Sequence, residues 1–127
     1  HRLGTREIEE TLSSHPAVAE CAVVGVADSL KGQVATAFVV LRDPSKAADA
    51  NARLALEGDL MSTVDKRLGA IARPNRVHFV TMLPKTRSGK VLRRSIQALC
   101  ERRDPGDLTT IEDPGAIDQV RQAVGAA

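Results

Sequence analysis

The chain of 127 residues is 43% hydrophobic and 27% charged, a size and balance that suit one domain with a single core. Its net charge of +2 implies no partner by itself, and no apolar run is long enough to span a bilayer, so we expect no membrane partner. Phe38 and Phe79 are the only two residues of the Phe, Trp and Tyr class. The core is therefore expected to be aliphatic.

The two cysteines, Cys21 and Cys100, lie in apolar stretches and have no C-x-x-C spacing, which excludes a disulfide scaffold. They predict reduced core thiols in a cytoplasmic protein, or in one of the mitochondrial matrix if the source is eukaryotic. The three histidines, His1, His15 and His78, are far apart and match no zinc spacing, so no metal site is predicted.

The first expected element is a short helix, with Thr5 as its N-cap. It is expected to end at His15, because a residue that precedes proline avoids the helical region. Two apolar runs then follow, at 17–26 and 34–41, with a polar loop at 27–33 between them. Continuous apolar runs of this length predict two strands that are buried on both faces of a small sheet.

A longer helix is predicted over 50–68, where apolar residues recur every four positions at Leu56, Leu60, Val64 and Leu68. Gly69 is the expected C-cap, and Pro74 prevents the helix from continuing. A third strand is expected at 76–80, followed by a loop over 83–89. One face of the next helix is made by Leu92, Ile96, Leu99 and Cys100.

The last part of the chain, 104–127, is rich in Pro, Gly and Asp at its start and is predicted to run as an extended tail over the surface. A short terminal helix closes it, with Asp113 as cap and Pro114 at the first helical position. The order of these elements predicts an α+β fold, with a small sheet of about three strands flanked by helices.

Charge is unevenly distributed along the chain. Between 85 and 103 one acid, Glu101, faces seven basic residues: Lys85, Arg87, Lys90, Arg93, Arg94, Arg102 and Arg103. From Asp104 onward, five acids face the single base Arg121. A basic segment followed by an acidic tail indicates that the basic part meets something anionic.

The informative stretch is 83–94, Leu-Pro-Lys-Thr-Arg-Ser-Gly-Lys-Val-Leu-Arg-Arg. Gly89 allows backbone conformations that other residues avoid. Lys90 follows it and is expected at the start of a helix, where free N–H groups also favour anions. A lysine in this place is a mobile cation suited to a phosphate or a carboxylate.

Three other interpretations of this stretch are a P-loop, a nucleic-acid contact and a solvated basic turn. A P-loop needs glycine and Ser or Thr where this chain has Pro84 and Val91, so two required positions fail. A nucleic-acid partner is not expected, because interleaved aromatics, a zinc spacing and a DNA-binding helix pair are all missing. From the residues alone, a solvated basic turn without a special role stays open.

The same stretch, 83–94, resembles the C-terminal signature of acyl-CoA synthetases within the adenylate-forming superfamily. Residues 1–9 resemble the segment just after that family's hinge, and 22–26 and 31–33 fit the strand and loop between. The tail at 103–111 resembles propionyl-CoA synthetases more closely than their acetyl relatives. Acetyl-CoA synthetase is the alternative.

The resemblance implies that 1–127 is one mobile, lysine-bearing C-terminal domain, a fragment that starts just after the hinge. It implies an AMP-forming acid–thiol ligase, in which Lys90 bridges the acyl carboxylate and the α-phosphate of ATP during adenylate formation. Lys85, Arg87, Ser88 and Gly89 form the supporting loop. The domain then rotates, and the thiol of CoA displaces AMP.

Anion contacts outside the loop are implied as well. Arg2 matches the family arginine that contacts nucleotide phosphate. A basic residue that contacts the CoA phosphate in acetyl-CoA synthetases falls on Asp65 here, which places that contact in doubt. Lys66, Arg67 and Arg73 are the candidates to replace it.

The resemblance also implies the cofactors and partners. The full-length enzyme is expected to use ATP/AMP, CoA and Mg²⁺, with none held by this fragment alone, which should be inactive in adenylation. The partner is a large N-terminal adenylation domain of the same chain, which sets acyl-chain specificity. Lys90 is also an expected target of a protein acetyltransferase and deacetylase, so the isolated fragment is alternatively a non-catalytic acetylation substrate.

Overall fold

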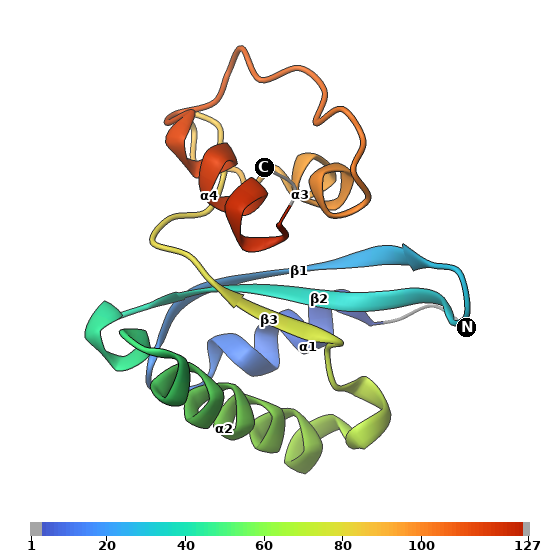
Figure 1. Ribbon diagram of the computed structural model, residues 1–127, viewed down its shortest axis with the longest axis vertical. Coiled ribbons are helices and arrows are strands. Elements are labelled where there is room, and N and C mark those ends of the chain that lie inside the picture. The colour runs from blue at the N-terminus through green and yellow to red at the C-terminus, as the bar shows by residue number, and fades with distance from the viewer. Residues whose placement is uncertain (1–3, 126–127) are drawn as a thin grey trace.

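A computed structural model of the chain describes residues 4–125. It has the predicted α+β fold, with a three-stranded sheet between helices (Figure 1). The main elements in chain order are α1 (Thr5–Ser13), β1 (Val18–Asp28), β2 (Gly32–Leu41), α2 (Ala50–Leu68), β3 (Arg76–Phe79), α3 (Arg93–Cys100) and α4 (Gly115–Ala123). Short 3₁₀ turns, η1 (Pro44–Ala47) and η2 (Ala70–Ala72), flank α2.

The sheet has the strand order β1-β2-β3, with β2 in the centre. β1 and β2 form an antiparallel hairpin, and β3 lies parallel to β2. The predicted polar loop over 27–33 is present but shorter, because backbone pairing continues to Asp28 and Gly32 and leaves a turn over 29–31. The side chain of Asp28 closes the short turn by accepting hydrogen bonds from the backbone N–H groups of Leu30 and Lys31, at 2.8 and 3.2 Å.

Both faces of the sheet are buried, as the two continuous apolar runs predicted. Side chains alternate between the faces, so Val23 packs on one side and Val24 on the other. The face toward α1 and α2 contributes to one cluster: Ile8, Leu12, Val18, Cys21, Val23, Ala35, Ala37, Val39, Leu41, Leu60, Val64 and Val77. The face toward α3 and α4 contributes to the other: Ala22, Val24, Phe38, Val40, Val80, Leu83, Ile96, Leu99, Ile111, Ile117 and Val120.

Helix boundaries follow the local signals closely. α2 has the predicted bounds, with Asp49 capping its start and Gly69 ending it at a positive φ of 90°. The prediction for Thr5 is wrong by one position. The first hydrogen bond of α1 runs from the N–H of Ile8 to the carbonyl of Gly4, at 3.0 Å, which makes Gly4 the N-cap. Thr5 is then the first helical residue.

The terminal helix begins slightly later than expected. The prediction of Asp113 as its cap is wrong by one position, because Pro114 is the N-cap of α4. The side chain of Asp113 instead accepts a hydrogen bond from the N–H of Gly115, at 2.8 Å, where the helix begins. Pro114 lies just before the first residue of α4 rather than within it. The chain between α3 and α4 runs as an extended arc, drawn in orange at the top of Figure 1.

The two edges of the sheet are covered by glutamates. On the β1 edge, the N–H of Val23 donates to Glu9 at 2.9 Å. On the β3 edge, the N–H of Val77 donates to Glu57 of α2 at 3.3 Å. A carboxylate that accepts an outward N–H prevents an edge strand from pairing with another chain. Glu9 also has a second partner, the guanidinium of Arg93.

Candidate functional site

The segment from Lys85 to Val91 forms a tight hairpin, called the Lys90 hairpin from here on. The N–H of Thr86 donates to the carbonyl of Lys90 at 2.9 Å, and the N–H of Gly89 donates to the carbonyl of Thr86 at 2.8 Å. Gly89 has a φ of 91°, and nothing lies within 4 Å of the side chain it lacks. A three-residue hairpin of this kind needs a residue with positive φ after the turn, which explains the glycine.

This geometry corrects the predicted position of Lys90. The lysine does not start a helix, because α3 begins at Arg93 with Leu92 as its N-cap. It lies on the outgoing arm of the hairpin, where its N–H donates to the hydroxyl of Thr86 at 3.1 Å. That hydroxyl also lies 2.9 Å from the hydroxyl of Ser88. Side-chain and backbone bonds together fix the turn from which Lys90 projects.

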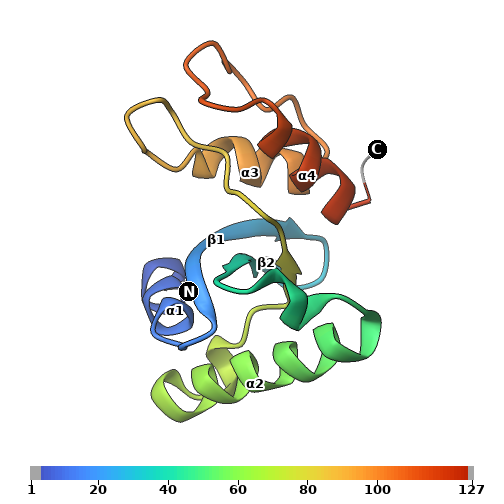
Figure 2. The same cartoon turned by 90° about the vertical axis from the view of Figure 1, so that its left-hand side faces the viewer.

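The side chain of Lys90 is exposed, and its ammonium has no hydrogen-bond or ion-pair partner among residues 4–125. It borders an open groove of about 420 Å³ at the junction of α1 and α3. The groove is lined by Arg6, Lys90, Val91, Leu92, Arg93, Arg94 and Ser95. Figure 2 shows the gold loop before α3 extending away from the sheet. The hairpin thus presents the exposed ammonium of Lys90 beside the other basic side chains of the groove.

The tail adds a third segment to the hairpin. The N–H of Arg87 donates to the carbonyl of Thr110 at 3.1 Å, and the N–H of Glu112 donates to the carbonyl of Lys85 at 2.8 Å. The guanidinium of Arg87 reaches the carbonyl of Thr109 at 3.3 Å. The buried side chain of Ile111 joins the cluster under α3 and α4. The tail therefore does more than cover the surface, since its backbone supports the loop.

Ion pairs tie both ends of the Lys90 hairpin to the first part of the chain. The ammonium of Lys85 lies 2.8 Å from Glu20 of β1. The guanidinium of Arg93 lies 2.7 Å from Glu9 of α1. Neither acid was among the predicted site residues. The sequence offered one signal for each acid. Glu20 is the single charge in an apolar strand, and Glu9 lies beside Ile8 on the buried side of α1.

The residues predicted to contact CoA form a separate group, the α2 end, which comprises Lys66, Arg67 and Arg73. Lys66 and Arg67 are exposed in the last turn of α2. Arg73 donates two hydrogen bonds to Asp65, and this contact holds the pKa of the Asp65 carboxyl below its usual value. α2 packs against the opposite face of the sheet from α3. Arg2 lies outside the described residues.

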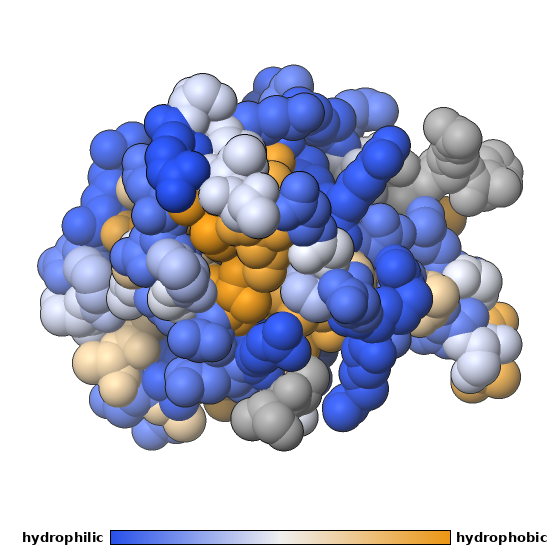
Figure 3. Space-filling model, turned by 90° about the horizontal axis from the view of Figure 1, so that it is seen from above, coloured by the Kyte–Doolittle hydropathy of each residue, from blue (hydrophilic) through white to orange (hydrophobic). Residues whose placement is uncertain are grey.

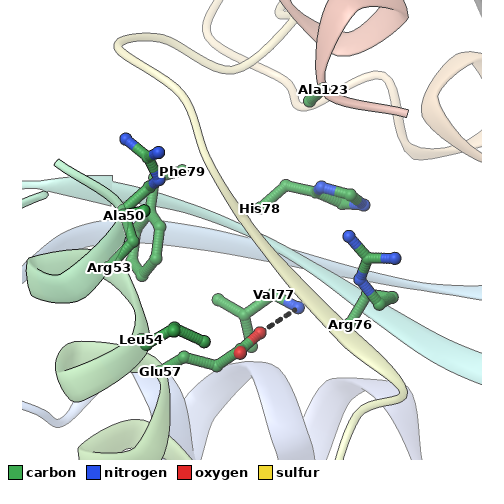
Figure 4. Close-up of a pocket in the computed structure, with 9 residues that line it drawn as sticks. All are labelled: Ala50, Arg53, Leu54, Glu57, Arg76, Val77, His78, Phe79 and Ala123. Carbon is green, nitrogen blue, oxygen red and sulfur yellow. Dashed lines mark hydrogen bonds between the residues drawn. The ribbon is translucent and has the colours of Figure 1, made fainter. Parts of the chain in front are cut away.

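A larger cavity, of about 580 Å³, lies between α2 and β3 (Figure 4). It contains none of the predicted site residues. His78, on its wall, stacks against Phe38 with ring centroids 5.0 Å apart. Burial first, and the nearby Arg76 second, lower the pKa of His78 to about 4. His78 is therefore neutral near pH 7 and half-buried against Phe38, in the strand where the sequence predicted it.

The cysteines are free thiols, with Cys21 buried and Cys100 half-buried. Burial raises the pKa of Cys21 to about 12 and that of Cys100 to about 11, so neither forms a thiolate nucleophile near neutral pH.

Between residues 4 and 125, no three His, Cys, Asp or Glu side chains gather as a metal site would require. No helix in the same range is long and apolar enough to cross a membrane.

The face that carries α3 and α4 is hydrophilic around its margin and has an apolar hollow near its centre (Figure 3). Two large apolar side chains elsewhere are also almost fully exposed. Leu30, at the turn of the β1–β2 hairpin, is 93% exposed, and Ile71, in η2, is 94% exposed.

Comparison with known proteins gives a consistent result. Residues 7–90 match the family described as AMP-binding enzyme C-terminal domain. Propionate–CoA ligase of Escherichia coli is 60% identical over 124 residues, which cover 98% of this chain and 20% of that protein. Acetyl-coenzyme A synthetase of Pyrobaculum aerophilum is 47% identical over 123 residues, which cover 97% of this chain and 18% of that protein.

Among solved structures, the crystal structure of Brucella canis acyl-CoA synthetase matches with a TM-score of 0.62 and 41% sequence identity. The match covers 72% of this chain and 16% of that chain. The chain spans about a fifth of the length of the curated relatives that it matches. The family match ends at residue 90, whereas the match to the ligase continues through nearly the whole chain, including α3, the tail and α4.

Proposed function

The chain belongs to the family of AMP-binding enzyme C-terminal domains, and on that basis we propose that it is the mobile domain of a longer, AMP-forming propionyl-CoA synthetase. The 60% identity to a propionate–CoA ligase, against 47% to an acetyl-coenzyme A synthetase, supports propionate as the acid. The observation that carries the proposal is the Lys90 hairpin, a hydrogen-bonded turn that holds an exposed ammonium with no partner among residues 4–125.

The chemistry of Lys90 follows from charge. In the first step, a carboxylate oxygen attacks the α-phosphorus of ATP, forms the acyl-phosphate bond and releases pyrophosphate. Two anions must approach each other, and a cation between them stabilises the charge that develops in the transition state. In the second step, the thiol of CoA attacks the acyl carbon and AMP leaves. Rotation of the domain would withdraw Lys90 and admit the thiol.

Most of the substrate contacts are proposed to lie in a large N-terminal part of the same protein. The relatives are about five times as long as this chain, and the exposed Leu30 and Ile71 suit packing against such a part. Mg²⁺ is proposed to arrive with ATP and to be held mainly by the N-terminal part.

The test is to assay the full-length protein with ATP, CoA and either propionate or acetate. Formation of propionyl-CoA, AMP and pyrophosphate, with a higher kcat/KM for propionate, is the expected result. Activity with acetate alone would move the assignment to an acetyl-CoA synthetase. Residues 1–127 alone should catalyse no propionate-dependent ATP–pyrophosphate exchange, and exchange by this chain alone would contradict the proposal.

A second role for Lys90 is supported by the same exposure. An exposed lysine next to a glycine on a protruding turn is accessible to a protein acetyltransferase, and acetylation would remove the charge that adenylation needs. The chain should therefore be labelled at Lys90 by acetyl-CoA and a cognate acetyltransferase, and a deacetylase should reverse the label. The Lys90→Arg variant is the control. Label that remains in this variant would show that another lysine is the target.

A further inference from the structure

Glu9 is only 8% exposed, and its carboxylate accepts three hydrogen bonds. One carboxylate oxygen accepts the N–H of Val23 at 2.9 Å and the Nε of Arg93 at 3.1 Å. The other accepts a terminal nitrogen of Arg93 at 2.7 Å. A buried carboxylate is costly unless it is paired, and here the two-point contact with a planar guanidinium also fixes orientation. The pair joins α1, the edge of β1 and the first residue of α3.

Arg93 is separated from Lys90 by only Val91 and Leu92. This connection has little freedom, because Leu92 donates its N–H to the carbonyl of Pro84 at 2.9 Å and Lys85 pairs with Val91. A shift of Arg93 relative to α1 would therefore be transmitted to the outgoing arm of the Lys90 hairpin. The incoming arm has its own attachment, from Lys85 to Glu20.

We propose that the Glu9–Arg93 ion pair positions Lys90 for adenylate formation, an inference that rests on the proposed function of Lys90. In this proposal Arg93 and Glu9 are positioning residues that act through Lys90. Their effect comes from rigidity: Lys90 stabilises the transition state only where its ammonium meets the developing charge, and a displacement of about 1 Å costs on the order of 100-fold in rate.

The experiment uses the full-length ligase that carries this chain and measures the two half-reactions separately. The first is acid-dependent ATP–pyrophosphate exchange, and the second is thioester formation from preformed acyl-AMP and CoA. In Glu9→Gln and in Arg93→Lys, the first half-reaction should fall by about 10- to 100-fold in kcat, with the second unchanged. Glu9→Gln keeps an oxygen for Val23 and retains the shape of the side chain.

The matched control is Glu10→Gln, since Glu10 is the next residue of α1 and its side chain is exposed. It should leave both half-reactions unchanged. A double-variant cycle with Lys90→Ala adds a readout that a purely structural role would not give. If the pair acts through Lys90, then Glu9→Gln should cause no further loss in the Lys90→Ala background.

The outcomes separate the inference from the function on which it rests. If Lys90→Ala abolishes the first half-reaction while Glu9→Gln and Arg93→Lys retain it, the positioning role is wrong and the function of Lys90 stands. Equal losses in both half-reactions, together with a lower Tm, would make the pair merely structural and would also overturn the inference. If Lys90→Ala retains the first half-reaction, the proposed function of Lys90 is itself wrong.

Discussion

The Lys90 hairpin and the α2 end are both basic, and the sequence made both of them candidates for contact with phosphate, yet they are built differently. The hairpin is fixed by backbone pairing within itself and with the tail, and ion pairs flank it on both sides. At the α2 end, Lys66 and Arg67 are exposed on a helix, and Arg73 is paired with Asp65.

The difference suggests what each region contributes. A fixed turn with an exposed ammonium suits a step in which the cation must meet charge that develops at one point. Exposed helical side chains suit looser attraction of a substrate phosphate, where position matters less. Asp65 also reduces the positive charge of the α2 end, because its carboxylate is paired with the guanidinium of Arg73. The following predictions test whether this contrast is functional.

The largest effect is expected for Lys90→Ala in the full-length protein. Adenylate formation should fall by about 10²- to 10³-fold, because the charge on the α-phosphate loses its mobile cation. Thioester formation from preformed propionyl-AMP should be unchanged. Lys66→Ala should leave adenylate formation intact, and any loss should be confined to thioester formation at low CoA. Rapid-quench measurement of the two half-reactions checks both variants. Equal losses of adenylate formation in Lys90→Ala and Lys66→Ala would show that the two regions do not differ in function.

The next effect compares two glycines with nearly the same φ. Gly89 and Gly69 have φ values of 91° and 90°, and neither has a neighbour that a methyl group would meet. Each change to alanine should therefore lower the free energy of unfolding by about 1–3 kcal/mol through backbone strain. Only Gly89→Ala should also slow adenylate formation, by about 10-fold, since it moves the turn that carries Lys90.

Thermal unfolding and ATP–pyrophosphate exchange check this pair of variants. If Gly69→Ala slowed exchange as much as Gly89→Ala, the loss would reflect stability, and the rigidity of the hairpin would have no separate role.

A smaller effect is expected at the α2 end. Replacing Lys66 and Arg67 together by alanine should raise the KM for CoA by about 3- to 10-fold, because exposed ion pairs with a phosphate contribute little each. The kcat of adenylate formation should not change. Steady-state kinetics at low and high salt checks this, since screening should reduce the difference. A KM that is unaffected at low salt would remove both residues from the CoA site.

The smallest effect is expected for Asp65→Asn. The pKa of Asp65 is lowered in the folded protein, so its pairing with Arg73 stabilises the fold above the ordinary carboxyl pKa and is lost as the pH falls through the lowered value. The variant should unfold at a slightly lower temperature than the parent at pH 7, and this difference should shrink as the pH falls through the lowered pKa. A difference that persists in acid would show that the contact is not electrostatic.

Much of this protein was determined by local sequence. The four-residue spacing and the flanking Asp49 and Gly69 set α2 at its predicted bounds, because helix periodicity and caps are local signals. Two continuous apolar runs predicted a sheet buried on both faces. The stretch from Leu83 to Arg94 was sufficient to indicate the family to which residues 7–90 belong.

The tertiary structure decided how Lys90 is held. The sequence placed it at a helix start, but a turn at Gly89 and pairing between Lys85 and Val91 placed it on a hairpin instead. Its supports come from distant positions: Glu9 reaches Arg93 across 84 residues, and the tail returns to pair with the loop. No local period encodes such contacts. They form only once both faces of the sheet are covered and the separate segments are brought together.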